Sequence, residues 1–261
     1  MNKFKKHIEK NKKAWNRRTP IHIESSFYNN KEFKQGKNSL KGIEINALGN
    51  IKGKKILHLQ CHFGQDSISL ARMGAEITAV DFSNVALTEA KKTAKETNTK
   101  VCFIESDVLT LNLNKKFDIV FTSYGVLGWL PDLKKWASVI SSHLKKEGFF
   151  LLTEFHPFPP LLDDSQYDYF YKEAPDQEKK YGSYTDKGKK VLIEDCWWNH
   201  SLTEIFFAIE SSGLKLLSFE EFDYSPFLLE GMIKREENKY VLKARASQKI
   251  PYVFNLKATK K

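Results

Sequence analysis

Cysteine is scarce in this sequence, and long apolar runs are missing altogether. The three cysteines, Cys61, Cys102 and Cys196, stand apart and form neither a CxxC motif nor a disulfide-like spacing. No run approaches the roughly 18 apolar residues that a membrane-spanning helix needs. The lysine-rich N-terminus also lacks the apolar core of a signal peptide. We therefore expect a soluble cytoplasmic protein with no membrane partner.

Acidic residues are sparse at the beginning of the chain. Residues 1–54 contain 14 Lys and Arg against 4 Glu, so this segment carries the whole formal net charge of +10 and the remainder is neutral. A basic arm of this kind is able to contact nucleic-acid phosphates. The plainer interpretation is a solvated helix, and both interpretations stay open at this point.

The stretch from residue 54 to 82 has the pattern of a nucleotide-binding βαβ unit. The short apolar run 56–59 is typical of a strand buried on both faces. A turn ending at Gly64 follows, and then an amphipathic pattern closed by Gly74. A second apolar run, 77–80, ends in Asp81. In such units the turn and the helix N-terminus face the ligand, and the terminal carboxylate accepts hydrogen bonds from ribose hydroxyls.

Helix and strand patterns alternate along much of the remaining chain. We predict helices at about 1–20, ending near Pro20, at about 84–97 with Ser83 as its cap, after Pro131 up to about 144, and from Ser201 to Gly213. We predict strands at about 101–104, 117–121, 149–153, 214–222 and 251–258, with a turn at 145–148. This alternation favours a mostly parallel, doubly wound α/β sheet.

Two segments interrupt the alternation and suggest a division of the chain. Residues 157–199 are rich in aromatic and charged side chains and favour an inserted antiparallel hairpin, and residues 226–248 form a second, charge-rich insertion. We expect residues 1–50 to form a basic helical arm or lid, and residues 51–261 to form the main domain with its two insertions.

Several short motifs occur in an order that resembles the class I S-adenosylmethionine-dependent methyltransferases. Residues 57–67 read Leu-His-Leu-Gln-Cys-His-Phe-Gly-Gln-Asp-Ser, and they are followed by Asp81-Phe82-Ser83, Ser106-Asp107-Val108, Phe117-Asp118-Ile119-Val120 and Leu144-Lys145-Lys146-Glu147-Gly148. The resemblance is close over 54–156 and looser over 200–259. The first motif looks like a variant from one branch of bacterial small-molecule methyltransferases. It departs from the family's acidic residue and GxGxG, of which only the last glycine, Gly64, is present.

The resemblance implies a Rossmann-like, seven-stranded, mostly parallel sheet with an antiparallel last strand. It also implies S-adenosylmethionine as cofactor, with S-adenosylhomocysteine as product. Asp81 would bind the ribose and Asp107 the adenine amino group, while Asp66 or the N-terminal segment would replace the missing acidic partner of the methionine amino group. Their plainer alternatives are an N-cap for Asp81 and a turn residue for Asp107.

Further cofactor contacts are expected around these carboxylates. Gly64 would permit close backbone approach. The other expected contacts are Gln60, His62, Phe82, Ser83, Val108 and Ser123, with Trp15 and Tyr28 as an aromatic lid over the sulfonium. A metal site is not expected, because His58, Cys61 and His62 lack the spacing and the fourth ligand of such a site.

Two side chains are candidates for catalysis on the methyl acceptor. His156 follows the fifth strand, where it is expected to point towards the same crevice and to act as a general base. Tyr124 follows the fourth strand, at the edge where α/β proteins bind their ligands. Packing beside Pro157 is the plainer explanation for His156, and packing at the strand end is the plainer one for Tyr124.

The sequence therefore predicts in-line methyl transfer to an O, N or S atom of a small-molecule acceptor. Two alternatives stay open: a non-catalytic binding protein on this scaffold, and an RNA or DNA methyltransferase that uses the basic arm. Against a nucleic-acid methyltransferase, the fourth strand ends in Thr122-Ser123-Tyr124-Gly125, not in an Asn/Asp-Pro-Pro-aromatic motif. A dinucleotide oxidoreductase is disfavoured because GxGxxG is absent.

Overall fold

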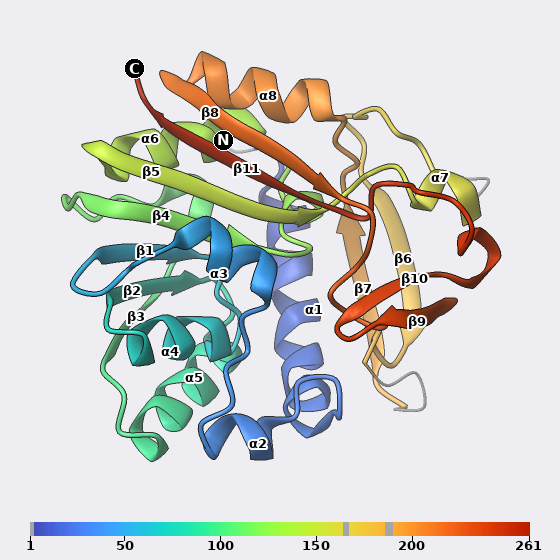
Figure 1. Cartoon of the computed structure of the whole chain (residues 1–261), viewed down its shortest axis with the longest axis horizontal. Coiled ribbons are helices and arrows are strands. Elements are labelled where there is room, and N and C mark those ends of the chain that lie inside the picture. Colours follow the sequence, from blue (N-terminus) through green and yellow to red (C-terminus); the bar gives the residue numbers. More distant parts are fainter. Residues whose placement is uncertain (1–2, 164–166, 186–189) are drawn as a thin grey trace.

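The computed structural model describes residues 3–163, 167–185 and 190–261. Within these residues a seven-stranded mixed sheet forms the centre of the molecule (Figure 1). Its strands in spatial order are β3 (Val101–Glu105), β2 (Glu76–Asp81), β1 (Lys55–Leu59), β4 (Phe117–Ser123), β5 (Leu144–Phe155), β11 (Val253–Lys260) and β8 (Leu214–Phe222). The pairs from β3 to β5 are parallel, and β11 runs antiparallel to both of its neighbours. The α/β fold predicted from the sequence is confirmed.

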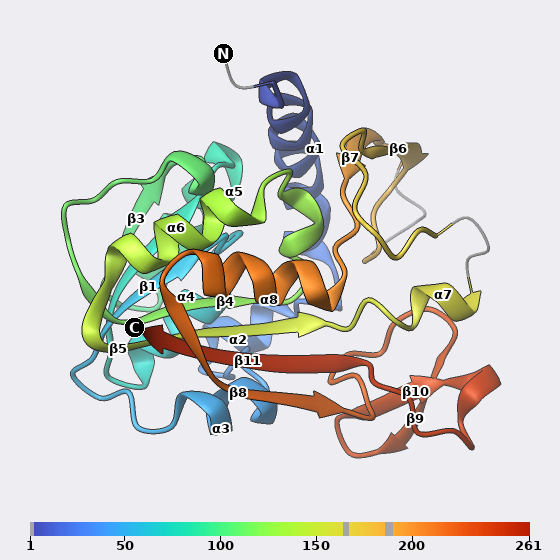
Figure 2. The ribbon, with the colours of Figure 1, turned by 90° about the horizontal axis from the view of Figure 1, so that it is seen from above.

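Helices cover both faces of this sheet. The helices around it are α3 (Gly42–Leu48), α4 (Gln65–Arg72), α5 (Asn84–Glu96), α6 (Leu133–His143) and α8 (Leu202–Ser211). Figure 2 shows α6 and α8 on one side of the sheet and α3 on the other. Consecutive residues of β1 therefore enter different cores: Ile56 packs with Leu48 and Leu70, whereas Leu57 packs in the cluster that contains Trp136 and Ile205. Burial on both faces explains why β1 is an unbroken apolar run.

The basic arm is a long helix, α1 (Lys5–Glu24), at the end of the sheet towards which the parallel strands point (Figures 1 and 2). It packs against β7 (Leu192–Trp197) and α5. The prediction that this helix ends near Pro20 is wrong by about one turn. Proline removes one backbone N–H and crowds the preceding turn, but Ile21 and His22 are buried just beyond it. These tertiary contacts carry the helix on to Glu24.

The two interruptions of the alternating pattern are both hairpins. In the first, β6 (Asp176–Tyr181) pairs antiparallel with β7, as predicted, although 164–166 and 186–189 of this segment lie outside the described residues. In the second, β9 (Met232–Glu236) pairs with β10 (Lys239–Leu242). The hairpins leave the sheet as separate two-stranded units at the same end as α1 (Figure 1).

Short elements complete the described chain. They are α2 (Asn30–Lys34), α7 (Pro160–Asp163) and the 3-10 turns η1 (Val108–Thr110), η2 (Leu127–Trp129) and η3 (Lys243–Arg245). The turn predicted at 145–148 is instead the beginning of β5, because Leu144 already pairs with Phe117 and an irregular register absorbs the following residues. In the part of the chain that the structure describes, no helix has the length and apolarity to cross a bilayer.

Candidate active site

A cavity of about 610 Å³ opens at the carboxyl ends of the central strands. It lies where the strand order reverses between β1 and β4, which is the usual ligand position in open α/β sheets. Its volume is in the range of small-molecule and cofactor sites. The lining comes from α1, the segment 26–44, the turn after β1, the ends of β2, β3, β4 and β5, Tyr184 of the first insertion, and the loop after β8 in the second insertion. The chain therefore brings its N-terminal arm and both insertions to one place.

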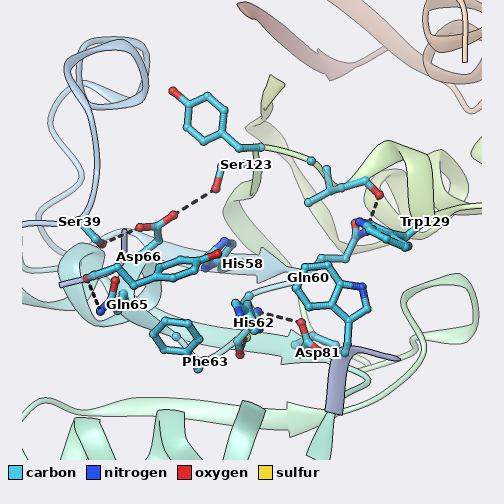
Figure 3. Close-up of a pocket in the computed structure, with 18 of the residues that line it drawn as sticks. Ser39, His58, Gln60, His62, Phe63, Gln65, Asp66, Asp81, Ser123 and Trp129 are labelled. Atoms are coloured by element: carbon cyan, nitrogen blue, oxygen red, sulfur yellow. Dashed lines mark hydrogen bonds between the residues drawn. The ribbon is translucent and has the colours of Figure 1, made fainter. Parts of the chain in front are cut away.

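The turn after β1 adopts left-handed backbone conformations that usually require glycine, although most of the residues in these conformations are not glycine. Gln60 and His62 have φ angles of 54° and 50°, and Gly64 has a φ of 79°. Left-handed conformations cost a residue with a side chain roughly 1–2 kcal/mol, so the surrounding structure must hold this turn. The side-chain amide of Gln60 donates to the Val126 carbonyl at 3.0 Å, and the His62 N–H donates to Asp81 at 2.8 Å (Figure 3).

Asp81 ends β2 with its carboxylate tied to the backbone on both sides. One oxygen accepts from the His62 N–H and the other from the Ser83 N–H, each at 2.8 Å. Burial raises the pKa of Asp81 to about 6, and the backbone N–H groups of Ser83, His62 and Phe82 oppose that rise. Each carboxylate oxygen has capacity for a further hydrogen bond. Asp81 is thus a fixed acceptor on the cavity wall, ionised at neutral pH.

Asp107 and Asp66 place two more carboxylates on the wall. Asp107 accepts from the Leu109 N–H at 2.9 Å and caps η1, so its position after β3 is fixed. Asp66 lies in the first turn of α4 and accepts from the hydroxyls of Ser39, at 2.6 Å, and Ser123, at 3.3 Å (Figure 3). Asp66 thereby joins the N-terminal segment, α4 and β4 at one point.

Glu154, a residue not predicted as part of the site, fixes the loop that follows β4. Its buried carboxylate accepts from the N–H groups of Gly125, Val126, Leu127 and Phe155, with the Val126 bond at 2.8 Å. Burial raises the pKa of Glu154, while these N–H donors lower it. The carboxylate therefore fixes the backbone of residues 124–126, which line the cavity.

Tyr124 and Glu44 form a hydrogen-bonded pair in the same wall. Tyr124 has a φ of 42°, which is an outlier for an aromatic residue. Its hydroxyl donates to Glu44 at 2.8 Å, and the other carboxylate oxygen of Glu44 accepts from the Lys41 N–H at 2.7 Å. Burial raises the pKa of Glu44 to about 7, and the nearby Asp66 adds to the rise. In the segment 21–50 the sequence pointed to Tyr28 as a site residue but not to Glu44.

The raised pKa of Glu44 predicts a specific dependence of stability on pH. The carboxyl is protonated more readily in the folded chain than in the unfolded chain, so its contribution to the free energy of unfolding is complete below about pH 4.5. That contribution declines as the pH rises to about 7, by about 3 kcal/mol for a shift of this size. Urea unfolding from pH 4.5 to 8 should therefore show wild type losing this amount relative to Glu44→Gln, which does not titrate. If the difference in unfolding free energy between wild type and Glu44→Gln stays constant over this pH range, the raised pKa of Glu44 is contradicted.

Aromatic and histidine side chains cover the cavity from the arm. The Trp15 ring lies 4.9 Å from His62 and 5.3 Å from Trp129, measured between ring centroids. Nδ1 of His22 lies 2.9 Å from Nε2 of His62, and Nε2 of His22 lies 2.7 Å from the Ser183 hydroxyl. Burial lowers the pKa of His22 to about 3 and lowers that of His62 as well, so both rings are neutral. This chain of contacts connects α1, the turn after β1 and the first insertion.

Several positively charged side chains of the basic arm form ion pairs or hydrogen bonds with other parts of the chain. Arg18 forms a buried ion pair with Asp195, and Lys12 pairs with Glu105 at 2.7 Å. The Arg17 guanidinium donates to the Leu192 carbonyl at 2.8 Å. Part of the positive charge of residues 1–54 therefore holds α1 against the hairpin and the main domain.

His156 is placed away from the position that the sequence suggested. Phe155 lines the cavity, and His156, the next residue, turns to the opposite side as successive residues of a strand do. Its Nδ1 accepts from the Phe158 N–H at 3.1 Å, and its Nε2 lies 3.0 Å from Glu221, without hydrogen-bond alignment. His156 does not line the cavity. The expectation that it faces the crevice as a general base is corrected accordingly.

Most of the other sequence candidates meet at the cavity. Those that line it are Trp15, Tyr28, Gln60, His62, Gly64, Asp66, Asp81, Phe82, Asp107, Val108, Ser123 and Tyr124. Ser83 does not; it supports Asp81 from behind and caps α5 by accepting from the Ala86 N–H. Trp129 also lines the cavity, whereas Trp198 packs with Phe4. Ser39, Glu44, Glu154 and Phe227 were not anticipated.

Gly64 contributes to packing as well as to the cavity wall. A Cβ atom added here would lie 2.9 Å from Cβ of Ala90 and 2.9 Å from the Phe103 ring. We predict that Gly64→Ala lowers the free energy of unfolding by about 2–4 kcal/mol, from the left-handed backbone and the overpacking together. Gly213→Ala is the matched control, because Gly213 has a φ of 76° but open space around it. It should lose only about 1 kcal/mol in urea unfolding, and equal losses would refute the packing argument.

Comparison with known proteins gives two kinds of similarity. Residues 56–148 match the family model described as a methyltransferase domain. Over 104 residues, 39% of this chain, the sequence is 35% identical to the mitochondrial ubiquinone biosynthesis O-methyltransferase of Schizosaccharomyces pombe. Over 77 residues, 29% of this chain, it is 36% identical to a putative protein N5-glutamine methyltransferase of Methanocaldococcus jannaschii. The matches span 38% and 39% of those relatives, so the chain covers less than two fifths of their length.

Solved structures are similar over nearly the whole chain. An S-adenosylmethionine-dependent methyltransferase from Clostridium acetobutylicum superposes with a TM-score of 0.60 at 18% identity, covering 92% of this chain and 94% of that one. The structure of DhpI in complex with SAH gives 0.61 at 14% identity, covering 97% of both chains. The chain thus shares the fold of these two structures, the first of which is an S-adenosylmethionine-dependent methyltransferase, and its residues 56–148 match the methyltransferase-domain model.

Proposed function

We propose that this protein transfers a methyl group from S-adenosylmethionine to an O, N or S atom of a small molecule and releases S-adenosylhomocysteine. The observation that carries the proposal is the cavity at the reversal of strand order, with the fixed carboxylate of Asp81 in its wall. The methyltransferase-domain match over residues 56–148 includes that carboxylate and the turn that binds it. We further propose that the chain belongs to the bacterial small-molecule branch with a variant first motif.

The residues at the cavity fit this cofactor. Asp81 offers acceptors for the ribose hydroxyls, Asp107 for the adenine amino group and Asp66 for the methionine ammonium group. Two buried side-chain atoms in the same wall, Oε1 of Gln60 and Nδ1 of His62, have no hydrogen-bond partner among the described residues. Buried polar atoms are rarely left without a partner, so these two favour a polar ligand beside the turn.

In the proposed mechanism, the chain aligns the methyl donor with the acceptor and excludes water from the site. Bound S-adenosylmethionine supplies a methyl group on a positively charged sulfur, which leaves as a neutral thioether. Trp15 and Tyr28 shield the cavity, and their π-faces suit a sulfonium cation. Glu154 holds the loop after β4 so that Tyr124 faces the acceptor. Fixed positioning of this kind supplies much of the rate enhancement in displacement reactions.

We propose the arm, residues 1–50, as the lid of this site. Ile8 and Trp15 of α1 and Tyr28 of the following segment line the cavity. The contact of His22 with His62 and Ser183 ties the arm to both the turn after β1 and the first insertion. This use of the arm favours a role in closing the small-molecule site over a role in binding nucleic acid.

Methyl transfer is tested directly with S-adenosylmethionine labelled in the methyl group and a panel of small phenols, amines and thiols. Wild type and Asp118→Asn, which changes an acid at the opposite end of β4, should form S-adenosylhomocysteine and a labelled product. Asp66→Asn should be slower, because it weakens the proposed contact to the methionine ammonium. Absence of label in every acceptor class, with S-adenosylhomocysteine bound normally, would favour a non-catalytic binding protein.

A further inference from the structure

The proposed cofactor set leaves one cavity-lining carboxylate without a role. Asp66, Asp81 and Asp107 each have a partner on the cofactor, whereas Glu44 has none. Glu44 is 1% exposed, and it lines the cavity together with Tyr124. A helix cap does not explain this placement, because a carboxylate can accept from the Lys41 N–H without being buried beside another acid. Burying a second carboxylate near Asp66 is costly, so a role for Glu44 is to be sought in the cavity.

Aromatic rings from separate parts of the chain surround this end of the cavity. The Phe227 ring, from the loop after β8, lies 4.9 Å from Tyr124 and 6.1 Å from Phe155, and it stacks on Phe27 at 5.6 Å. All of these residues line the cavity. The Ser225 hydroxyl fixes the loop, because it accepts from the Phe227 N–H at 3.1 Å. This aromatic wall faces the space beside Glu44.

The charge around the aromatic wall is suited to a cation. Glu44 contributes a carboxylate beside Asp66, whose own proposed partner is the ammonium group of the cofactor, and the Tyr124 hydroxyl completes the polar surface. The ammonium of Lys41 already lies 4.9 Å from the centre of the Phe227 ring, so one face of that ring already interacts with a positive charge. Aromatic faces combined with carboxylates are the arrangement that recognises ammonium groups.

We propose that the methyl acceptor is an amine, and that Glu44 binds its ammonium form beside the aromatic wall and removes its proton before transfer. This inference rests on the proposed methyltransferase function. The ammonium transfers one proton to Glu44 and becomes a neutral amine with a free electron pair. That pair forms the new N–C bond as the S–C bond breaks and its electrons remain on sulfur. The product is a methylated ammonium, and the protonated Glu44 later releases its proton to solvent.

The state of Glu44 is suited to this proton transfer. Its pKa of about 7, raised by burial, makes it a stronger base than an exposed glutamate and leaves it able to release the proton again. The charged and titratable groups around it are Asp66, Tyr124 and Lys41, of which Asp66 raises its pKa further and the Tyr124 hydroxyl lowers it. The Tyr124 hydroxyl, which donates to Glu44, is a positioning group for the carboxylate.

The test uses matched probes bound to the full chain saturated with S-adenosylhomocysteine. Phenethylamine, 2-phenylethanol and 3-phenylpropionate share a ring and chain but differ in the polar end group. Calorimetry at pH 8 should show phenethylamine binding at least tenfold more tightly than the other two probes. Glu44→Gln should remove that preference, and Glu44→Asp should retain part of it. Thermal unfolding establishes that each variant is folded.

The outcomes separate this proposal from the function on which it rests. If wild type does not bind S-adenosylhomocysteine, the proposed function itself fails. If it does, equal binding of the three probes, no binding of phenethylamine, or an amine preference that persists in Glu44→Gln would each overturn the amine proposal. As a second readout, the amine preference of wild type should decline between pH 8 and pH 6 as Glu44 becomes protonated. A preference independent of pH would also contradict the role of Glu44.

Discussion

Replacing Glu154 with glutamine should remove cofactor binding and lower the free energy of unfolding by about 3 kcal/mol. The carboxylate accepts from the N–H groups of Gly125, Val126, Leu127 and Phe155, and the loop after β4 is arranged around it. The glutamine amide directs an NH₂ group at some of these donors, which leaves buried N–H groups unpaired. Burial raises the pKa of Glu154, so the ionised carboxylate is costly to bury. Replacing it costs more still, because its N–H donors are then left buried without an acceptor.

The measurement is urea unfolding together with titration of S-adenosylhomocysteine. Glu147→Gln is the matched control, because Glu147 is an exposed glutamate on the same strand. The control should change stability by less than about 0.5 kcal/mol and leave binding unaltered. A Glu154→Gln protein as stable as wild type, with intact binding, would show that the loop is held by other contacts.

Replacing Asp81 with asparagine should weaken the binding of S-adenosylhomocysteine by roughly 30- to 150-fold. The change replaces an ionised acceptor with a neutral one, and loss of charge-assisted hydrogen bonds to a ribose costs about 2–3 kcal/mol. The side chain keeps its size, and its remaining oxygen is still able to accept from the His62 or Ser83 N–H. The fold should therefore survive with a modest loss of stability.

Calorimetric titration of wild type, Asp81→Asn and Asp118→Asn measures this effect. Asp118 accepts from the Lys55 N–H at the opposite end of the sheet, so its variant controls for the loss of one negative charge. Wild-type affinity should also fall as the pH drops below about 6, where Asp81 becomes protonated, whereas the affinity of Asp81→Asn should not change there. Equal affinities for all three proteins would mean that Asp81 acts only as a structural acceptor.

Local sequence patterns were sufficient to predict most strands and helices of the sheet, whereas its antiparallel last strand was expected from the family resemblance. The apolar runs at 56–59 and 77–80 became β1 and β2, and Ser83 caps α5 as its position suggested. These features depend on neighbours in the sequence and on burial on both faces of the sheet. The end of α1 was not predictable in this way, because the contacts that carry it past Pro20 come from distant parts of the chain.

The candidate site was most directly predictable where a residue's position on a strand decides its direction. Asp81, Asp107 and Ser123 end or follow parallel strands, so the topology alone directs them to one edge. His156 was misplaced because a single residue of offset reverses the side of the sheet that a side chain faces. Glu44 could not be recognised, because its burial results from the packing of α3 against β5 and β11 and from its contact with Tyr124, all of which are distant in the sequence.

We propose that the cavity at the reversal of strand order binds S-adenosylmethionine and its product, and the most direct test is the ligand specificity of this cavity. Calorimetric titration of the full chain with S-adenosylhomocysteine, and in parallel with NAD, should give micromolar binding of S-adenosylhomocysteine and none of NAD. Binding should be weakened by Asp81→Asn and preserved by Asp118→Asn. If the folded wild type does not bind S-adenosylhomocysteine, or binds NAD equally well, the methyltransferase assignment is contradicted.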